Sequence, residues 1–289
     1  MDLEQRFRVP AKGFDLTACD PADTAGLEKA EAEERRARDL ERLADLQERL
    51  YAEGRRSLLV VLQAMDAAGK DGTIAHVMRG LNPQGVTVTA FKQPTAVELA
   101  HDFLWRAQLA LPARGRIGVF NRSHYEEVLV VRVHPDYLAG QAIDPKRGRD
   151  DGLWRERFAD INAWERHLVR DGTRVVKFLL NVSRAEQRRR FLARAGEERK
   201  NWKFSAGDVA ERAHWADYQA AYQDALRHTS PADAPWYVVP ADHKWVTRTV
   251  VASILAKHLE ALDPRFPEPS DEDRVAMDAA VATLTAEKD

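Results

Sequence analysis

A short apolar run followed by a glycine-containing loop constrains the fold of this chain more than any other feature. Residues 58–62 read Leu-Leu-Val-Val-Leu, a continuous apolar stretch typical of a parallel strand that is covered on both faces. The loop at residues 64–73 follows directly. After it, apolar residues recur at helical spacing until Asn82-Pro83, namely Ile74, Val77, Met78 and Leu81. The sequence therefore predicts a strand, a loop and a helix in the order that phosphate binding requires.

The loop has the chemistry of a phosphate-binding loop without its usual pattern. Gly69 permits a turn whose backbone N–H groups can face phosphate oxygens, Lys70 can reach the outer phosphates, and a helix N-terminus adds partial positive charge. The usual pattern has Gly where this chain has Ala64, and Ser or Thr where it has Asp71. Carboxylate oxygens suit Mg²⁺, so we expect Asp66 to help hold the metal. The alternative is a plain glycine turn with surface charges.

Composition excludes several classes of protein. The 289 residues carry a formal net charge of -2, so no overall basic character indicates nucleic-acid binding. Cys19 is the only cysteine, which excludes an internal disulfide and a cysteine-rich metal site. No apolar run approaches the roughly 18 residues of a membrane span, and the N-terminus has no leader-like apolar core. We expect a cytoplasmic protein that does not bind a membrane.

Strand-like and helix-like segments alternate along the chain, which predicts an α/β fold with a mostly parallel sheet, helices on both faces, and ligands at the carboxyl ends of the strands. The further strand-like segments are residues 86–91, 116–120, 174–181 and 236–239. The helix-like segments are residues 26–53, 96–111, 153–169, a charged helix from Arg184, 208–227 and 244–262. The predicted divisions are an N-terminal extension with a packing helix (1–56), a core (57–262) and an acidic tail (263–289). The tail is expected to form a weak helix or an oligomer contact.

Polar side chains follow the predicted strand at residues 116–120. Asn121 stands where P-loop enzymes usually carry an aspartate that organises Mg²⁺, and Arg122 offers a planar fork for phosphate oxygens. Glu126 could orient a metal-bound water or a ribose, while His124 and Tyr125 could contact a base or a phosphate. The alternatives are structural: Tyr125 in the core, His124 as a hydrogen-bonded loop residue, and Glu126 at a helix N-terminus. We expect direct ligand roles first for Asn121 and Arg122.

A basic segment follows the strand-like residues 174–181. Residues 184–203 carry eight basic and three acidic side chains, and they include the stretch Lys-Asn-Trp-Lys-Phe at 200–204. A charge run is usually a solvated helix face, and Arg189 and Arg190 fit that simple interpretation. A cationic helical hairpin after a strand is also typical of the lid of phosphate-transfer enzymes, which excludes water and supplies arginines. We therefore predict a lid at about residues 184–215.

Three motifs together resemble the family-2 polyphosphate kinases, and particularly the subgroup that accepts AMP as well as ADP. They are residues 64–72 (AMDAAGKDG), 120–126 (FNRSHYE) and 200–205 (KNWKFS), in the family's order. The resemblance implies a P-loop kinase-like three-layer sandwich with a helical lid, Mg²⁺ as cofactor with Mn²⁺ as the alternative, and phosphoryl transfer between inorganic polyphosphate and AMP or ADP. Many relatives carry aspartate at the position of Asn121, and a neutral amide is a weaker metal ligand than a carboxylate.

The resemblance and the chemistry together predict the following site. The catalytic residues are Asp66, Lys70, Asn121, Arg122 and Glu126, with Asp66 and Asn121 as metal ligands. The phosphate-binding residues are Ala67, Ala68, Gly69, Lys70, Asp71, Gly72, Thr73, Lys92, Arg122, Arg132, Arg184 and Arg188. The expected partners are polyphosphate, adenine nucleotides (guanine nucleotides as an alternative) and a second copy in a homodimer or homotetramer. An ATP-dependent nucleoside monophosphate kinase and a non-catalytic nucleotide switch are the competing functions.

Overall fold

A five-stranded parallel sheet forms the centre of the molecule. The computed structural model describes residues 1–198 and 206–287, and its strand order is β2-β3-β1-β4-β5. All four neighbouring pairs are parallel, which confirms the predicted α/β sandwich. The strands are β1 (Ser57–Gln63), β2 (Val86–Ala90), β3 (Ile117–Asn121), β4 (Thr173–Asn181) and β5 (Trp236–Pro240). Every residue of β1 is buried, as its continuous apolar run predicts.

The register of the strands brings four loops to one edge of the sheet. Leu62 of β1 pairs with Asn121, and Gln63 pairs with Leu179, while Asn181 pairs with Pro240. Because the strands are parallel and end nearly level, the segments that follow β1, β3, β4 and β5 leave from the same edge. This edge is where a doubly wound sheet binds its ligands.

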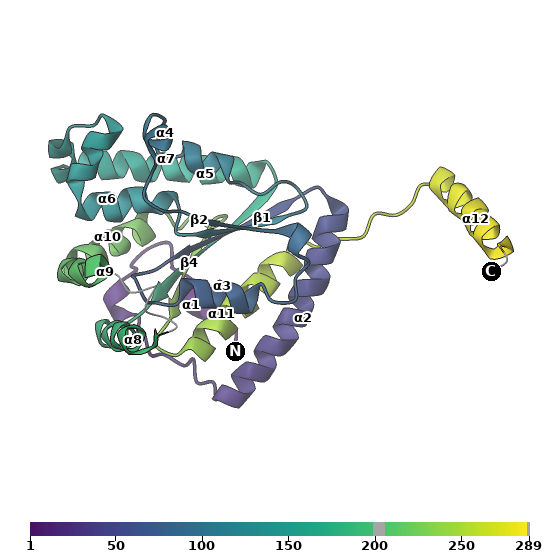
Figure 1. Ribbon diagram of the computed structural model, residues 1–289, viewed down its shortest axis with the longest axis horizontal. Helices are drawn as coiled ribbons and strands as arrows, with labels where there is room; N and C mark the ends of the chain where they lie inside the picture. The colour runs from purple at the N-terminus through teal and green to yellow at the C-terminus, as the bar shows by residue number, and fades with distance from the viewer. Residues whose placement is uncertain (199–205, 288–289) are drawn as a thin grey trace.

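Helices cover both faces of the sheet (Figure 1). On one face lie α1, α2, α3 and α11, where α11 packs against α2 and α3; on the other lie α5, α6 and α7. The α-helices are α1 (Leu3–Phe7), α2 (Lys29–Glu53), α3 (Lys70–Val77), α4 (Ala96–Leu99), α5 (Trp105–Leu109), α6 (Val130–Val133), α7 (Asp151–Arg170), α8 (Arg184–Gly196), α9 (Ala206–Ala210), α10 (Trp215–His228), α11 (Lys244–Glu260) and α12 (Asp271–Ala286). The 3₁₀ helices are η1 (Leu16–Ala18), η2 (Pro83–Gly85), η3 (His124–Val128), η4 (Pro135–Gln141), η5 (Pro145–Arg149) and η7 (Glu211–His214).

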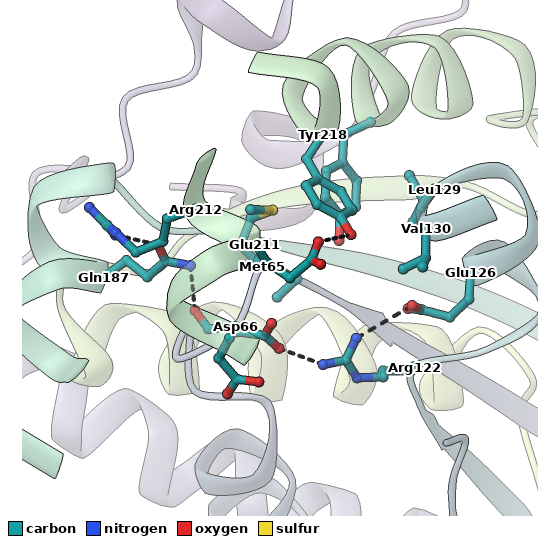
Figure 2. Close-up of a pocket in the computed structure, with 13 residues that line it drawn as sticks. Met65, Asp66, Arg122, Glu126, Leu129, Val130, Gln187, Glu211, Arg212 and Tyr218 are labelled. Carbon is teal, nitrogen blue, oxygen red and sulfur yellow. Dashed lines mark hydrogen bonds and ion pairs between the residues drawn. The ribbon is translucent and has the colours of Figure 1, made fainter. Parts of the chain in front are cut away.

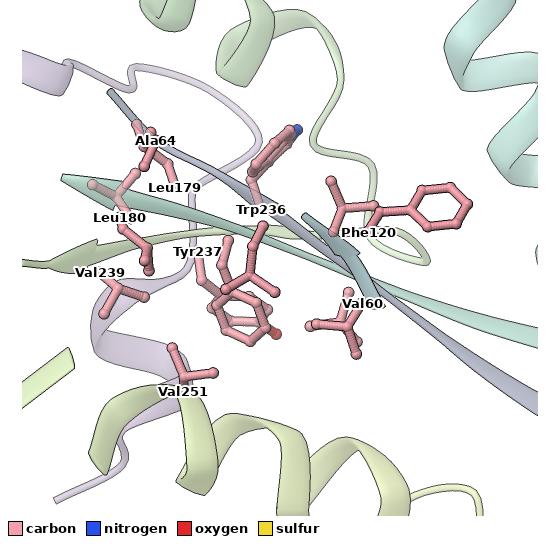
Figure 3. Close-up of a cluster of buried hydrophobic side chains, with 14 of the residues drawn as sticks. Val60, Ala64, Phe120, Leu179, Leu180, Trp236, Tyr237, Val239 and Val251 are labelled. Carbon is pink, nitrogen blue, oxygen red and sulfur yellow. The ribbon is translucent and has the colours of Figure 1, made fainter. Parts of the chain in front are cut away.

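The core is built from the side chains that these elements direct toward each other. Val60, Phe120 and Trp236 come from three strands, and Val251 comes from α11 beneath them (Figure 3). All four side chains are at most 1% exposed. Burial of this apolar surface is the main favourable term in folding, so the core fixes the strands whose ends carry the site.

Two predicted helices are interrupted, and one is shorter than predicted. Residues 96–111 form α4 and α5 with a turn between them, where the Asp102 carboxylate accepts the N–H of Leu104 at 2.9 Å. Such side-chain bonds compete with helix continuation. Residues 208–227 divide among α9, η7 and α10. α3 ends at Val77 because Gly80 adopts φ +89°, although Leu81 is buried as its spacing predicts.

The end of the chain leaves the body of the molecule. Residues 265–287, which we call the arm, are all exposed, and α12 stands apart at the end of an extended segment (Figure 1). Ser270 begins α12 through a capping box with Asp273. A search of the described residues for a helix long and apolar enough to cross a membrane finds none.

Candidate active site

The phosphate loop is a tight turn between β1 and α3. Ala67 and Gly69 adopt φ values of +60° and +110°, and Gly69 precedes the first residue of α3. The second value is left-handed backbone that favours glycine, which explains the requirement for Gly69. The carbonyl of Gly69 accepts the N–H of Thr73 at 2.9 Å, so the helix begins immediately after the turn.

Lys70 lies inside this loop. Its Nζ donates to the carbonyl of Ala64 at 2.8 Å, and the residue is only 9% exposed. Burial and the nearby Arg122 lower the pKa of Lys70 to about 8, although the carboxylates of Asp66 and Glu126 partly oppose this shift. Lys70 therefore lines the loop as a cation whose charge is sensitive to pH.

Arg190 of α8 ties the phosphate loop to the segment that follows β5. Its Nη1 donates to the carbonyls of Ala68 at 2.6 Å and Ala67 at 3.1 Å, while its Nη2 donates to Ala241 at 2.5 Å and Asp242 at 3.2 Å. We call these four bonds the Arg190 clamp. Arg190 is 7% exposed, so the interpretation of this residue as part of a solvated helix face is wrong. The clamp draws carbonyls of the loop toward α8.

Arg122 lies between two carboxylates. Its Nη2 donates to Asp66, and its Nη1 lies 3.4 Å from Glu126 Oε2 (Figure 2). Burial alone would lower the pKa of Arg122, but Glu126 and Asp66 raise it above its ordinary value. The guanidinium thus stays charged. We call these three side chains the Asp66–Arg122–Glu126 group, and they connect the segment after β1 with the segment after β3.

Asn121 and Asp71 form a second contact between the loops, with Asn121 Nδ2 donating to Asp71 Oδ1 at 2.8 Å. Within the described ranges, no three His, Cys, Asp or Glu side chains are grouped to hold a metal. Mg²⁺ usually takes one or two protein carboxylates and completes its shell with water and substrate phosphate. Asp66 and Asp71, which line the same cavity, supply this set of oxygen donors, so the site fits such an ion. Asn121 contacts Asp71 and offers a weaker, neutral ligand.

A buried polar network supports the turn that follows Arg122. Tyr125 OH donates to Glu165 Oε1 at 2.9 Å and accepts from Lys177 Nζ at 3.0 Å, and all three side chains are fully buried. Burial and the Glu165 carboxylate raise the pKa of Tyr125 well above its ordinary value, so the phenol remains a donor. Burial also lowers the pKa of His124. The position of Tyr125 matches its structural alternative in the core. His124 is buried beside it, but its ring makes no hydrogen bond with a described residue, and its Nε2 lies 3.5 Å from Glu165 Oε1.

The loops surround a cationic cavity with a volume of about 680 Å³. Its basic side chains come from α3, from the segments that follow β2 and β3, and from α8 and α11. They are Lys70, Lys92, Arg122, Arg189, Arg190, Arg194, Lys244 and Arg248. The acidic lining is Asp66, Asp71 and Glu197. The predicted loop residues Ala67, Ala68, Gly69, Gly72 and Thr73 line it too. This excess of cations suits a polyanion.

Three predicted phosphate-binding residues lie elsewhere. Arg132 Nη2 bonds to Asp224 at 2.7 Å, and Arg132 does not line the cationic cavity. Arg184 and Arg188 are exposed on another side of α8. The motif at residues 200–205 lies outside the described residues. Lys244 and Arg248 were not among the predicted residues, although their position after β5, at the same edge of the sheet, is a signal that could have identified them.

A more apolar cavity of about 580 Å³ adjoins the cationic one. Both cavities share Phe91, Lys92 and Arg122 as lining residues. The apolar wall includes Pro94, Leu99, Val130, Val131 and Tyr137, and Glu126 lies at its polar side. A cavity with apolar walls and a few polar groups suits an organic ligand better than an inorganic anion. Arg122 therefore stands between two sites of different chemistry.

Comparisons with known proteins identify the family of this chain. The family model described as polyphosphate kinase 2 matches residues 26–267. The "ADP-polyphosphate phosphotransferase" of Rhodopseudomonas palustris is 54% identical over 79% of each chain. The "AMP/ADP-polyphosphate phosphotransferase" of Meiothermus ruber is 45% identical over 92% of this chain and 96% of the relative. The crystal structure of polyphosphate kinase 2 from Arthrobacter aurescens aligns with a TM-score of 0.89 at 43% identity, over 98% of this chain and 97% of that one.

Proposed function

Because the chain belongs to the polyphosphate kinase 2 family, we propose that it transfers a phosphoryl group between inorganic polyphosphate and AMP or ADP. The observation that carries this proposal is the pair of cavities that meet at Arg122. The cationic cavity takes the terminal segment of polyphosphate, a ligand that has many charges and no base. The more apolar cavity takes the nucleoside of the acceptor, and Arg122 lies where the two phosphate groups meet.

The proposed reaction is an in-line displacement at the terminal phosphorus of the polymer. An anionic phosphate oxygen of the nucleotide attacks this phosphorus while the bond to the bridging oxygen breaks, and the shortened polymer leaves with that oxygen as an anion. The attacking oxygen is already ionised, so alignment and charge neutralisation matter more than a general base. Lys70 and Arg122 neutralise charge on the transferred group, and Glu126 orients Arg122.

Asp66 and Asp71 would hold the divalent metal, which we propose to be Mg²⁺, with Mn²⁺ as the alternative. The family generally uses a divalent metal, and the carboxylate oxygens of these residues are hard ligands. When bound, the ion supplies positive charge to the phosphate oxygens of the substrates. Asn121 fixes the Asp71 carboxylate through its 2.8 Å hydrogen bond and thereby prepares one of these ligands.

The deciding experiment supplies ADP, polyphosphate and Mg²⁺ without ATP. We expect ATP to form, and AMP in place of ADP to give ADP. A reaction without polymer measures any conversion of two ADP into ATP and AMP. Lys70→Ala, checked for folding by circular dichroism, is expected to lower the rate at least ~100-fold, because it removes charge from the transferred group. A wild-type protein that phosphorylates AMP only from ATP would instead be a nucleoside monophosphate kinase.

Several properties predicted from the sequence remain as further proposals. We propose a homodimer or homotetramer, a cytoplasmic location, and a division into N-terminal extension, core with lid, and acidic tail at the predicted boundaries. A relative from Pseudomonas aeruginosa is named "GDP-polyphosphate phosphotransferase", which makes guanine nucleotides a second acceptor class to measure.

A further inference from the structure

A hollow rich in arginine lies at the opposite edge of the sheet from the phosphate loop. It has a volume of about 570 Å³ and is lined by Glu53, Arg55, Arg56, Arg114, Arg170, Asp171 and Gly172, which we call the arginine hollow. These residues precede β1, β3 and β4, so the hollow lies where the strands begin. In Figure 1 this is the end from which the arm leaves, whereas α8 and α9 gather at the other end.

The carboxylates of the hollow are already bound. Glu53 pairs with Arg56, whose guanidinium also donates to the carbonyls of Leu262 and Asp263. Arg114 Nη2 donates to both carboxylate oxygens of Asp171, at 3.1 and 3.2 Å. Arg56 and Arg114 therefore have fixed positions. Neither Glu53 nor Asp171 is left to neutralise the charges of Arg55 and Arg170.

Arg55 and Arg170 carry the surplus positive charge. Both side chains are exposed, and neither guanidinium makes a hydrogen bond or ion pair with a residue in the described part of the chain, although the backbone carbonyl of Arg55 accepts from Arg114 Nη1 at 2.9 Å. Gly172 adopts φ +93°, and a Cβ at this position would lie 3.5 Å from Arg114 Nη1. That distance is an ordinary van der Waals contact, so the left-handed backbone, and not a lack of space, explains the glycine at this position. The hollow thus presents two open guanidinium forks beside two ordered ones.

We propose that the arginine hollow is a second, non-catalytic site for polyphosphate, where a distant segment of the long polymer binds. This inference rests on the proposed function. Guanidinium forks match phosphate oxygens in geometry and charge. The hollow has no aromatic side chain among its lining residues and so lacks the usual platform on which a nucleoside base stacks. An anchored polymer raises the local concentration of its free end at the catalytic site.

The separation of the two sites makes the inference specific to long polymers. Seven residues of β1 separate Arg56 from the phosphate loop, a span of about 23 Å at the usual rise per residue. A short chain that fills the cationic cavity does not reach the hollow. Only long chains should therefore depend on Arg55 and Arg170.

The test compares Arg55→Ala/Arg170→Ala with the wild type on long-chain and short-chain polyphosphate. We expect the KM for the long polymer to rise about fivefold, while kcat and the KM for the short chain stay unchanged, because the anchor changes only local concentration. The charge-reversed variant Arg55→Glu/Arg170→Glu should raise the long-chain KM further. The control is Arg155→Ala/Arg274→Ala, which removes the same charge from exposed positions outside the hollow.

Direct binding separates failure of this inference from failure of the proposed function. Long polymer should bind the Lys70→Ala protein, and the added changes at Arg55 and Arg170 should weaken that binding and reduce its dependence on salt. An unchanged long-chain KM in a wild-type-like transferase overturns the anchor and leaves the function standing. An equal loss for short chains, or single-stranded DNA displacing the polymer from the hollow as well as polyphosphate does, also overturns it.

Discussion

At the scale of single residues, burial decides how Lys70 works. A lysine ammonium in water keeps its proton well above neutral pH, but the side chain of Lys70 is enclosed by the loop and faces Arg122. Its pKa of about 8 lies close to neutral pH. The spacing of Gly69 and Lys70 predicts that Lys70 contacts phosphate. The lowered pKa of Lys70 was not predictable in this way, because it depends on burial by residues far along the chain.

We expect kcat/KM for polyphosphate to fall as the pH rises through about 8. A depressed pKa means that the folded, free enzyme loses the Lys70 proton in this range, and the neutral amine no longer attracts the donor. Lys70→Arg keeps its charge, so its profile should lack this descending limb. Initial rates over a range of pH provide the measurement, and an identical limb in both proteins would assign the titration to another group.

Tyr125→Phe tests whether the buried network positions Arg122 and Glu126. The change removes only the hydroxyl that bonds Glu165 and Lys177, so we expect kcat to fall about tenfold and stability to fall by about 1 kcal/mol. Tyr237→Phe is the matched control, because its buried hydroxyl bonds Glu4 and His258 away from the site. Equal loss of stability with unchanged kcat in both variants would reduce the network to a structural role.

At the scale of elements, α8 and the phosphate loop form one unit. The sequence predicted both segments from local signals, namely the apolar run before the loop and the charged helical pattern after Arg184. It did not predict that Arg190 binds Ala68 and Ala241, because these partners are far from it in sequence and use backbone carbonyls, which leave no signal in residue type. Phe191, a buried neighbour on the same helix, was the available hint.

Arg190→Lys separates the clamp from its charge. A lysine keeps the positive charge but cannot bond four carbonyls at once, so we expect stability to fall by about 2–3 kcal/mol and the KM for polyphosphate to rise about tenfold. The exposed Arg188→Lys, on the same helix but outside the lining of the cationic cavity, is the control. Denaturant unfolding and steady-state kinetics measure the two effects. Wild-type behaviour of Arg190→Lys would mean that charge alone matters at this position.

At the scale of the whole molecule, the sheet was predictable and the placement of cations was not. Alternating strand and helix patterns specify a parallel sheet, and the edge rule then brings Asp66, Lys70, Asn121 and Arg122 together. Arg132 has the right charge but a closer partner in Asp224, which no local pattern reveals. The pairing of long side chains depends on tertiary distances, so a list of basic residues over-predicts the site.

Removal of the arm is expected to leave the body intact. Every residue from 265 to 287 is exposed, so a chain ending at Pro264 loses no described core contact. We expect the free energy of unfolding to change by less than about 0.5 kcal/mol, because surface changes away from the core rarely cost more. Denaturant titration measures this, with light scattering to detect a change of mass. A loss of several kcal/mol would show that the arm covers apolar surface, most simply in a second copy.

The Asp66–Arg122–Glu126 group has a consequence for the order in which ligands can fill the site. One guanidinium shared by two carboxylates leaves a surplus negative charge. An anion that binds Arg122 displaces the Asp66 carboxylate, which then repels the anion. A cation that binds Asp66 removes this repulsion. Anion and cation should therefore each tighten the other's binding by the same factor, as thermodynamic reciprocity requires. The ligand-free site should therefore bind the anion and the cation together more tightly than it binds either one alone.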